Sequence, residues 1–324
     1  MIGFFPHGNI QRPRDIICVL FKTNRKKYHY RNYSMMNVGI IGTGLLGSAI
    51  AKRLASKGHK IFVYNRTKQK AEPLKKFGIQ VLDSPKEIAS KCQFVMTVLK
   101  DAPVIEEIAF GKNGIIQGKH NELIVIDMST INPISSRDIA KKFSEHGISM
   151  IDAPVMGGPN LAENGQMIIM VGGSREIYEK CRQVFDSIGE RSFLLGENGA
   201  GHAMKLAMNS QIAILALSLS EGIILAKKSG LDPLTFLEVL NSTYFKTGMS
   251  VNKGPKMVNG NFEPSFFLKM MQKDLDEIKF TAEKFGANIP MSKLANEIFQ
   301  KAIKNGFGDI DYTGILSYLE KLKA

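Results

Sequence analysis

Cysteine is scarce in this sequence, and its few cysteines are badly placed for covalent or metal links. Cys18, Cys92 and Cys181 are odd in number and far apart along the chain. Isolated thiols of this kind make no disulfide framework, which favours a reducing compartment and, as a first expectation, the cytoplasm. No cluster of cysteine and histidine has the spacing of zinc ligands, so we expect no metal site.

Long apolar runs are also absent. The charge-free run within the apolar helical stretch that begins near residue 200 covers residues 206–220 and ends before Glu221. It is shorter than the roughly 20 residues that a membrane-spanning helix needs. Residues 16–21 are too few for the apolar region of a signal peptide. The sequence therefore predicts a protein that does not enter a membrane.

Acidic residues are outnumbered, which at first suggests a nucleic-acid partner. There are 43 lysines and arginines against 30 aspartates and glutamates, so the formal net charge is +13. Much of the excess lies in residues 1–36, where Asp15 is the one acid, and acids and bases alternate over the rest of the chain. A mild positive field on that remainder suits an anionic cofactor and an anionic substrate. We therefore expect no nucleic-acid partner.

Residues 1–36 form a basic extension without the period of a helix or a strand. Met35 and Met36 directly precede the first expected strand. We therefore expect either a disordered arm or translation from a start upstream of the natural one. A basic, acid-poor segment would also suit a mitochondrial transit peptide, although this one has little serine. A mitochondrial location is thus the alternative to the cytoplasm.

From residue 37 to residue 196, strand and helix patterns alternate, and beyond that the pattern is helical. The length of 324 residues suggests two domains, and 44% hydrophobic residues can fill their cores. Alternation predicts an α/β fold with a Rossmann-type doubly wound sheet, followed by an all-helical second domain. We place these domains at 37–198 and 199–324. The expected strands are 37–41, 61–64, 94–99, 123–127, 148–152, 167–171 and 192–195, and the expected helices are 48–57, 68–77, 86–90, 104–110, 133–146 and 176–188.

A glycine-rich turn follows the first expected strand. The sequence Gly42-Thr43-Gly44-Leu45-Leu46-Gly47 runs from an apolar strand into a helical pattern, and a second strand comes next. In that context the first glycine permits a tight turn and the second lets backbone N–H groups approach a pyrophosphate. The third lets the helix pack on the strand. We expect these six residues to bind a nicotinamide dinucleotide.

The end of the second strand bears on the choice between NAD and NADP. An NAD enzyme usually places an acidic residue here to bind the ribose hydroxyls, but this chain reads Asn65-Arg66-Thr67. Arg66 offers a planar guanidinium that suits a 2′-phosphate, whereas a carboxylate would repel it. The sequence therefore predicts NADP in preference to NAD, with Asn65, Arg66 and Thr67 at the cofactor.

A second glycine-rich turn, from Gly199 to Gly201, opens a long apolar helix that carries Lys205 and Asn209. These two residues are four apart, so they lie on one face of the helix. From this stretch alone, two interpretations stay open. The helix is either a buried core element with one lysine reaching to solvent, or the support of a working ammonium group.

Several motifs, in order along residues 37–324, resemble the β-hydroxyacid dehydrogenase superfamily. They are Gly42-x-Gly-x-x-Gly47, Asp127-Met-Ser-Thr130, Asp152-Ala-Pro-Val-Met-Gly-Gly158, the stretch from Gly199 to Asn209, and Lys273-Asp274. The resemblance implies that Lys205 is the catalytic proton donor or acceptor. It also implies that Asn209 holds the lysine or the substrate oxygen. The chemistry agrees, because an ammonium group stabilises the charge that grows on a carbonyl oxygen during reduction and supplies its proton.

The same resemblance implies contacts to a carboxylate substrate. Ser129 and Thr130, together with Gly157 and Gly158, would hold the carboxylate, and Thr130 would also line the nicotinamide site. From the residues alone, Ser129-Thr130 would equally suit capping of the helix that begins near Pro133. One departure is notable, because Met156 stands where the family usually has serine. It removes a hydroxyl donor from the expected pocket.

Finer motifs resemble the glyoxylate/succinic semialdehyde reductase branch of that superfamily. By this resemblance Phe266 and Asp274 face the substrate, and Lys273 approaches the cofactor. Taken alone, Phe266 would suit a core and Lys273-Asp274 a solvated surface pair. The matching segments are Ala162-Glu-Asn-Gly-Gln166, Arg191-Ser-Phe, Gly254-Pro-Lys-Met257, Gln272-Lys273-Asp274 and Gly308-Asp-Ile-Asp311-Tyr.

We therefore expect an NADPH-dependent reductase that converts glyoxylate or succinic semialdehyde to the hydroxy acid. One alternative is a 3-hydroxyisobutyrate dehydrogenase that oxidises its hydroxy acid with NAD or NADP. Another is a non-catalytic cofactor-binding scaffold with a basic arm, against which the presence of Lys205 argues. The family forms dimers or tetramers, and an all-helical domain built on an apolar helix suits a homo-oligomer.

Overall fold

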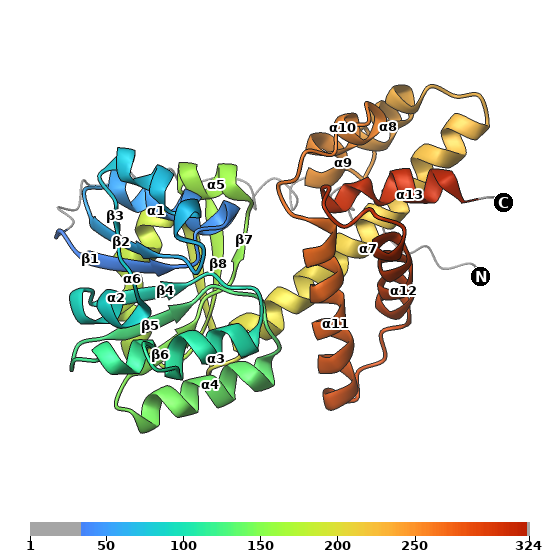
Figure 1. Ribbon diagram of the computed structural model, residues 1–324. Helices are drawn as coiled ribbons and strands as arrows, with labels where there is room; N and C mark the ends of the chain where they lie inside the picture. The colour runs from blue at the N-terminus through green and yellow to red at the C-terminus, as the bar shows by residue number, and fades with distance from the viewer. Residues whose placement is uncertain (1–33, 323–324) are drawn as a thin grey trace, which may run out of the picture. The chain divides into compact units, whose positions relative to one another are not determined.

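The computed structural model describes residues 34–322, and from Met35 onward the chain forms one compact unit. The expectations for the basic extension, and for Cys18 within it, lie almost entirely outside the described residues. The other two cysteines, Cys92 and Cys181, are buried free thiols. Figure 1 shows the order of the elements along the described chain.

The first half of this unit is a nine-stranded sheet. Its strand order is β3-β2-β1-β4-β5-β6-β8-β7, and β9 also pairs with β8. Neighbours from β3 through to β6 are parallel, with Val38 opposite both Ile61 and Phe94, whereas β8 is antiparallel to β6 and β7. The strands are β1 Asn37–Ile41, β2 Lys60–Tyr64, β3 Gln80–Val81, β4 Phe94–Thr97, β5 Ile124–Asp127, β6 Ser149–Asp152, β7 Val155–Met156, β8 Met167–Gly172 and β9 Gly189–Gly196.

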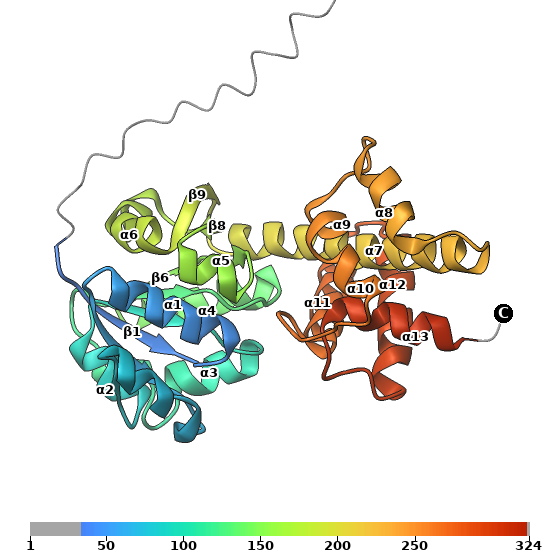
Figure 2. The ribbon, with the colours of Figure 1, turned by 90° about the horizontal axis from the view of Figure 1, so that it is seen from above.

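Helices cover both faces of the sheet. In the views of Figures 1 and 2, α1, α5 and α6 lie on one face and α2, α3 and α4 on the other. Two separate apolar cores follow from this, one around Ile40 and Phe185 and the other around Ile105 and Phe143. The predicted doubly wound α/β fold is confirmed. These helices are α1 Leu45–Ser56, α2 Pro85–Lys91, α3 Ala102–Phe110, α4 Pro133–Glu145, α5 Pro159–Asn164 and α6 Arg175–Ile188.

One expected helix in this half is not an α-helix. Residues 68–77 form two short 3₁₀ segments, η1 Lys68–Lys70 and η2 Glu72–Phe77, instead of one continuous helix. Pro73 lies in the middle of that range, where its ring would clash with the preceding turn and it has no N–H to donate. Another 3₁₀ segment, η3 Ile115–Gly118, precedes β5.

The second half is helical and is built along α7, Ala200–Lys228. Its start lies directly against β8, since a Cβ at Gly201 would come within 2.3 Å of the Met170 carbonyl oxygen. Further along, Leu206 and Ala213 share one buried core with Leu275 and Phe299. The remaining elements are α8 Pro233–Asn241, α9 Gly248–Asn252, α10 Gly254–Val258, α11 Leu268–Phe285, α12 Pro290–Lys304, η4 Tyr312–Gly314 and α13 Ile315–Lys321.

By length and composition alone, α7 would be long enough to cross a bilayer. Its most apolar 18-residue window has a mean hydropathy of 1.4. The central helix of a globular protein passes the same test, and α7 supplies the residues around which α11, α12 and α13 pack.

Candidate active site

The turn between β1 and α1 has the backbone geometry that its glycines predict. Gly42 has a φ of +102°, and a Cβ there would lie 2.3 Å from the Val98 carbonyl oxygen. A Cβ at Gly47 would lie 2.0 Å from the Gly42 carbonyl oxygen, so the helix could not pack this closely with any other residue. A Cβ at Gly44 would meet no atom within 4 Å. The open side of the turn is therefore at Gly44.

This open side has unsatisfied donors that suit an anion. Helix α1 begins at Leu45 without a side-chain cap from its N-cap residue, so among the described residues the N–H groups of its first turn remain free to bind a ligand. The Thr43 hydroxyl is buried and has no hydrogen-bond partner within the described residues. A buried hydroxyl of this kind needs a partner, and a pyrophosphate oxygen at the helix N-terminus would provide one. The residues present fit the dinucleotide that the motif predicts.

At the end of β2, the side chain of Asn65 is hydrogen-bonded within the protein, whereas the side chain of Arg66 is exposed. The Asn65 side chain is used within the protein, because its Oδ1 accepts from the Thr43 N–H at 3.0 Å and its Nδ2 donates to the Thr67 carbonyl at 2.9 Å. Asn65 therefore holds the glycine turn against the end of β2. Arg66 is exposed and, within the part of the chain that the structure covers, its side chain makes no hydrogen bond or ion pair. The guanidinium group of Arg66 therefore remains free to bind a phosphate group.

The start of α7 is anchored to the carboxyl ends of the strands by one aspartate. Asp152, the last residue of β6, accepts hydrogen bonds from the Gly199 N–H at 2.7 Å and from the His202 N–H at 3.0 Å. Gly199 is the N-cap residue of α7 and His202 lies in its first turn, so Asp152 supplies the cap that the glycine has no side chain to make. Burial raises the pKa of Asp152, while the nearby His202 and these two backbone donors oppose that rise.

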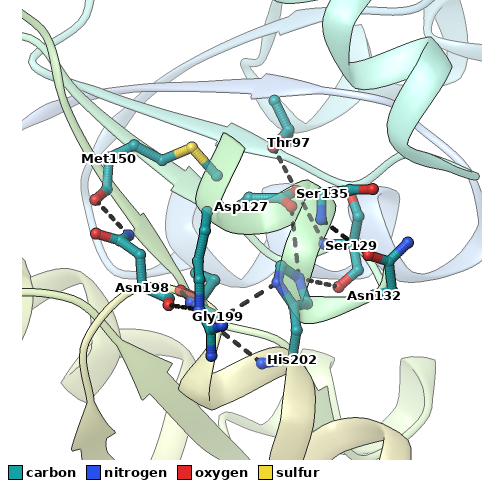
Figure 3. A network of polar contacts seen from close by, with 11 residues as sticks. Thr97, Asp127, Ser129, Asn132, Ser135, Met150, Asn198, Gly199 and His202 are labelled. Atoms are coloured by element: carbon teal, nitrogen blue, oxygen red, sulfur yellow. Dashed lines mark hydrogen bonds and ion pairs between the residues drawn. The ribbon is translucent and has the colours of Figure 1, made fainter. Parts of the chain in front are cut away.

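His202 continues this anchor as a second, buried connection, shown in Figure 3. Its Nε2 donates to the Ser129 carbonyl at 3.0 Å and lies 3.5 Å from an oxygen of Asp127. The other ring nitrogen lies 3.7 Å from an oxygen of Asp152. The side chains of the histidine and both aspartates are fully buried. Strands β5 and β6 are thereby joined to α7 one turn before Lys205.

Lys205 projects into a cavity of about 260 Å³ that residues from both halves line. Its Nζ lies 3.4 Å from the Met156 sulfur, a weak acceptor. Burial lowers the pKa of Lys205 to about 8. The Asp274 carboxylate acts in the opposite direction, and the Lys273 ammonium lowers the pKa further. A lysine with such a pKa can release and regain a proton near neutral pH.

Beside Lys205, a chain of polar contacts runs from α7 through α11 to the sheet. Asn209, which is 1% exposed, donates from Nδ2 to Asp274 at 2.6 Å. Asp274 pairs with the Lys273 ammonium at 2.5 Å, and Lys273 also donates to the Thr130 carbonyl. Lys273-Asp274 is therefore a nearly buried pair, and the surface interpretation of this pair is wrong.

Most of the predicted catalytic and substrate-binding residues line this cavity, whereas of the residues predicted for the glycine turn only Leu46 does so. The lining residues are Leu46, Met128, Thr130, Val155, Met156, Gly157, Gly158, Pro159, Lys205, Asn209, Ile212, Lys253, Ser265, Phe266, Asp274 and Tyr312. Thr130, Gly157, Gly158, Lys205, Asn209, Phe266 and Asp274 are thus brought together. Lys253, Ser265 and Tyr312 were missed, although Lys253 directly precedes the motif Gly254-Pro-Lys-Met257, Ser265 directly precedes Phe266, and Tyr312 ends the motif Gly308-Asp-Ile-Asp311-Tyr. Their positions in or beside these motif residues were the signal by which the sequence could have identified them.

Ser129 is the predicted substrate residue that the structure places elsewhere. It is 3% exposed, it does not line the cavity, and its hydroxyl accepts from the Leu99 N–H at 2.9 Å. The hydroxyl is thus occupied in joining two strand ends. The capping alternative for Ser129-Thr130 is also wrong. Asn132 caps α4, since its Oδ1 accepts from the Ser135 N–H at 2.8 Å.

Two family models match the chain in succession. Residues 37–196 match the NAD binding domain of 6-phosphogluconate dehydrogenase. Residues 199–319 match the model described as NAD-binding of NADP-dependent 3-hydroxyisobutyrate dehydrogenase.

Similar proteins agree with those matches. Glyoxylate/succinic semialdehyde reductase 1 of Arabidopsis thaliana is 34% identical over 281 residues, which is 87% of this chain and 97% of that protein. The chloroplastic reductase 2 of the same plant is 34% identical over 289 residues, covering 89% of this chain and 81% of the relative. A solved 3-hydroxyisobutyrate dehydrogenase of Mycobacterium tuberculosis with L-serine superposes with a TM-score of 0.79 at 24% identity, covering 88% and 99% of the two chains, and supports the fold.

Proposed function

We propose that this chain, which belongs to the β-hydroxyacid dehydrogenase family, reduces short aldehyde or keto acids with NADPH. As a member of that family, it is an NAD(P)-dependent oxidoreductase that acts on the hydroxyl groups of hydroxy acids. Glyoxylate and succinic semialdehyde are the proposed substrates. The observation that carries this proposal is Lys205, whose pKa is lowered to about 8 in a cavity shared with Asn209 and Gly157-Gly158. The scaffold alternative is set aside, because Lys205 is present and lines the cavity.

The proposed reaction assigns proton transfer to Lys205. A bound nicotinamide ring would supply the hydride to the carbonyl carbon. As negative charge grows on the carbonyl oxygen, the Lys205 ammonium stabilises it and donates the proton. Asn209 cannot swing freely, because Asp274 accepts from its amide nitrogen. The amide oxygen of Asn209 is thereby oriented, and it holds the lysine or the substrate hydroxyl in place.

The substrate carboxylate lies against Gly157-Gly158 in this proposal. Gly157 has a φ of +132°, a backbone conformation that favours glycine, and Gly157 and Gly158 line the cavity, where their backbone N–H groups can donate to a carboxylate. Thr130 lines the same cavity. Met156 offers a thioether where a hydroxyl would bind the carboxylate better, so the site depends more on backbone donors and on cations.

NADPH is the proposed cofactor, on the basis of the end of β2. Arg66 is exposed and free there, and no acidic residue follows the strand before Glu72. A free guanidinium favours a 2′-phosphate, and the missing carboxylate leaves the ribose hydroxyls of NAD without their usual acceptor.

A substrate panel tests the proposal. The chain is assayed with NADPH and NADH against glyoxylate and succinic semialdehyde, and in the other direction against 3-hydroxyisobutyrate with NADP⁺ and NAD⁺. The proposal expects the highest kcat/KM for one of the two aldehyde acids with NADPH. A higher value for 3-hydroxyisobutyrate would replace it with the dehydrogenase alternative.

We also propose a homo-oligomer, a dimer or a tetramer, in the cytoplasm. Support for assembly comes from large apolar side chains on the helical half that are at least 60% exposed. They are Leu225, Leu231, Val239, Tyr244 and Phe245. The two free thiols, Cys92 and Cys181, suit a reducing compartment. Light scattering during gel filtration tests the assembly, and a single chain's mass at micromolar concentration would contradict it.

A further inference from the structure

Lys253 is a second lysine that lines the cavity of Lys205. It lies between α9 and α10, and its side chain is 21% exposed. Its ammonium donates to the Ser265 hydroxyl at 2.7 Å and to the Asp311 carboxylate at 2.8 Å. An ammonium group has three donors. Within the described residues, one donor of Lys253 remains for a ligand in the cavity.

The position of that ammonium is fixed from behind by Asp311. Asp311 is 1% exposed, and its other oxygen accepts from the Thr313 N–H at 3.2 Å and the Thr313 hydroxyl at 2.7 Å. Burial acts to raise the pKa of Asp311, but the hydrogen bonds from Lys253, Thr313 and Ser265 outweigh it and lower the pKa. Asp311 is therefore an ionised partner held in place, which makes Lys253 a preorganised cation.

The glycine pair connects this cation to the catalytic lysine. A Cβ added to Gly158 would lie 4.0 Å from the Ser265 Cβ, so Gly158 faces the serine to which Lys253 donates. At the other end of the same segment, Met156 contacts the Lys205 ammonium. Three consecutive residues span at most about 7 Å between their first and last Cα atoms. The Lys253 ammonium is thus linked through Ser265 to the Gly158 end of this segment, and the Lys205 ammonium contacts its Met156 end.

The ionised groups around the cavity leave one positive charge unbalanced, which suits the binding of one singly charged anion. The Lys253 charge is balanced by Asp311, and the Lys273 charge is balanced by Asp274. Lys205 has no carboxylate within ion-pair distance in the described chain, so the cavity has one uncompensated positive charge while that lysine is protonated. A substrate with one carboxylate restores neutrality there.

We propose that Lys253 binds the substrate carboxylate at the Gly158 end of the cavity and so presents the carbonyl group to Lys205 at the Met156 end. The substrate class is a short, singly charged acid with its aldehyde or ketone at the other end of the molecule. This assignment rests on the proposed reductase function. It adds a specificity residue from the helical half, and it leaves proton transfer to Lys205.

The test compares a charged substrate with its uncharged methyl ester, which has the same carbon chain and one additional methyl group. In Lys253→Met, the KM for succinic semialdehyde rises about 10- to 100-fold, the range expected when a hydrogen bond to a charged group is lost. The KM for the methyl ester of succinic semialdehyde stays within about twofold. Equal losses for acid and ester, or an unchanged KM for the acid, would overturn the assignment.

Two further variants control for effects on the fold. Lys256→Met removes an equivalent charge from an exposed residue of α10, outside the cavity, and leaves both KM values unchanged. Lys253→Arg keeps a cation beside Asp311 and so keeps the melting temperature. It recovers part of the affinity for the acid, whereas a purely structural role for Lys253 would give no difference between acid and ester.

A binding measurement separates this inference from the reductase proposal. If the unaltered protein reduced neither the acid nor the ester, the proposed function would fail. Calorimetric titration of the NADP⁺-loaded protein with butyrate, a singly charged acid of the same chain length as succinic semialdehyde, then still tests Lys253. Binding weakened in Lys253→Met but retained in Lys256→Met supports the carboxylate site, and equal binding in both variants refutes it.

Discussion

Asp152 accepts a hydrogen bond from the His202 backbone N–H at 3.0 Å, and the imidazole ring of the same histidine lies 3.7 Å from the same carboxylate. The end of β6 is thereby joined to α7 through both the main chain and the side chain of one residue. Lys205 follows within a turn of the helix, so its position relative to the strand ends depends on this contact.

Replacing Asp152 tests that dependence. Asp152→Ala leaves two buried N–H donors unsatisfied, and each such donor costs about 1–3 kcal/mol. The free energy of unfolding in urea is therefore expected to fall by about 2–6 kcal/mol. In the folded fraction kcat also falls, while the Kd for NADPH is unchanged. Asp138→Asn, an exposed change on α4, is the matched control. A kcat equal to that of the control would show that the contact does not position Lys205.

Lys205→Met tests the proposed acid directly. Methionine fills a similar volume but carries no proton, so kcat for reduction is expected to fall about 10²- to 10⁴-fold. NADPH binding, followed by fluorescence titration, stays normal because no contact to the glycine turn changes. Lys228→Met, an exposed change at the end of the same helix, serves for comparison. Near-normal turnover in Lys205→Met would refute the mechanism.

The pH dependence of the reaction follows from the lowered pKa of Lys205, about 8 in the folded protein. A general acid works only while it is protonated, so kcat/KM for reduction is constant below about pH 8 and falls about tenfold per pH unit above it. Oxidation of the hydroxy acid needs the neutral amine, and its kcat/KM rises through the same pH. Both profiles are measured with saturating cofactor. A reduction rate that stays level to pH 10 contradicts this assignment.

The cofactor preference is tested with Arg66→Asp. The new carboxylate repels the 2′-phosphate of NADPH and offers an acceptor for the ribose hydroxyls of NADH. The ratio of kcat/KM for NADPH to that for NADH is expected to fall by about 10- to 100-fold, the loss of one charge-assisted hydrogen bond. Arg175→Asp makes the same charge change in the exposed first turn of α6 and leaves the ratio alone. If the ratio of kcat/KM for NADPH to that for NADH is unchanged in Arg66→Asp, a group other than Arg66 recognises the 2′-phosphate.

Elements set by local geometry were predictable from the sequence. The turn at Gly42 requires a positive φ and a close approach to Val98, so glycine marks it without knowledge of the fold. Strand ends such as Asp127 and Asp152 were also predictable, because apolar runs stop there. The helix expected over 68–77 was misjudged, since the effect of Pro73 depends on where the helix would begin.

Side-chain roles that depend on a distant partner were not predictable. Ser129 was expected at the substrate, but its hydroxyl accepts a hydrogen bond from the N–H of Leu99, which is 30 residues away in the sequence. Asn65 was expected at the cofactor, yet its amide holds Thr43 and Thr67. A polar side chain binds whichever partner the fold brings within reach, and sequence spacing does not state that partner.

The sequence by itself determined the family, the alternation of strands and helices up to residue 196, and the lysine around which the site is built. These follow from backbone sterics, apolar periodicity and motifs that hold over a few residues. Only the tertiary structure decided that Lys253 and Asp311, 58 positions apart, form an ion pair in the same cavity as Lys205. It likewise decided that His202 is buried between two strand ends. Such contacts depend on how separate helices pack, and long-range packing is the information that a local pattern does not carry.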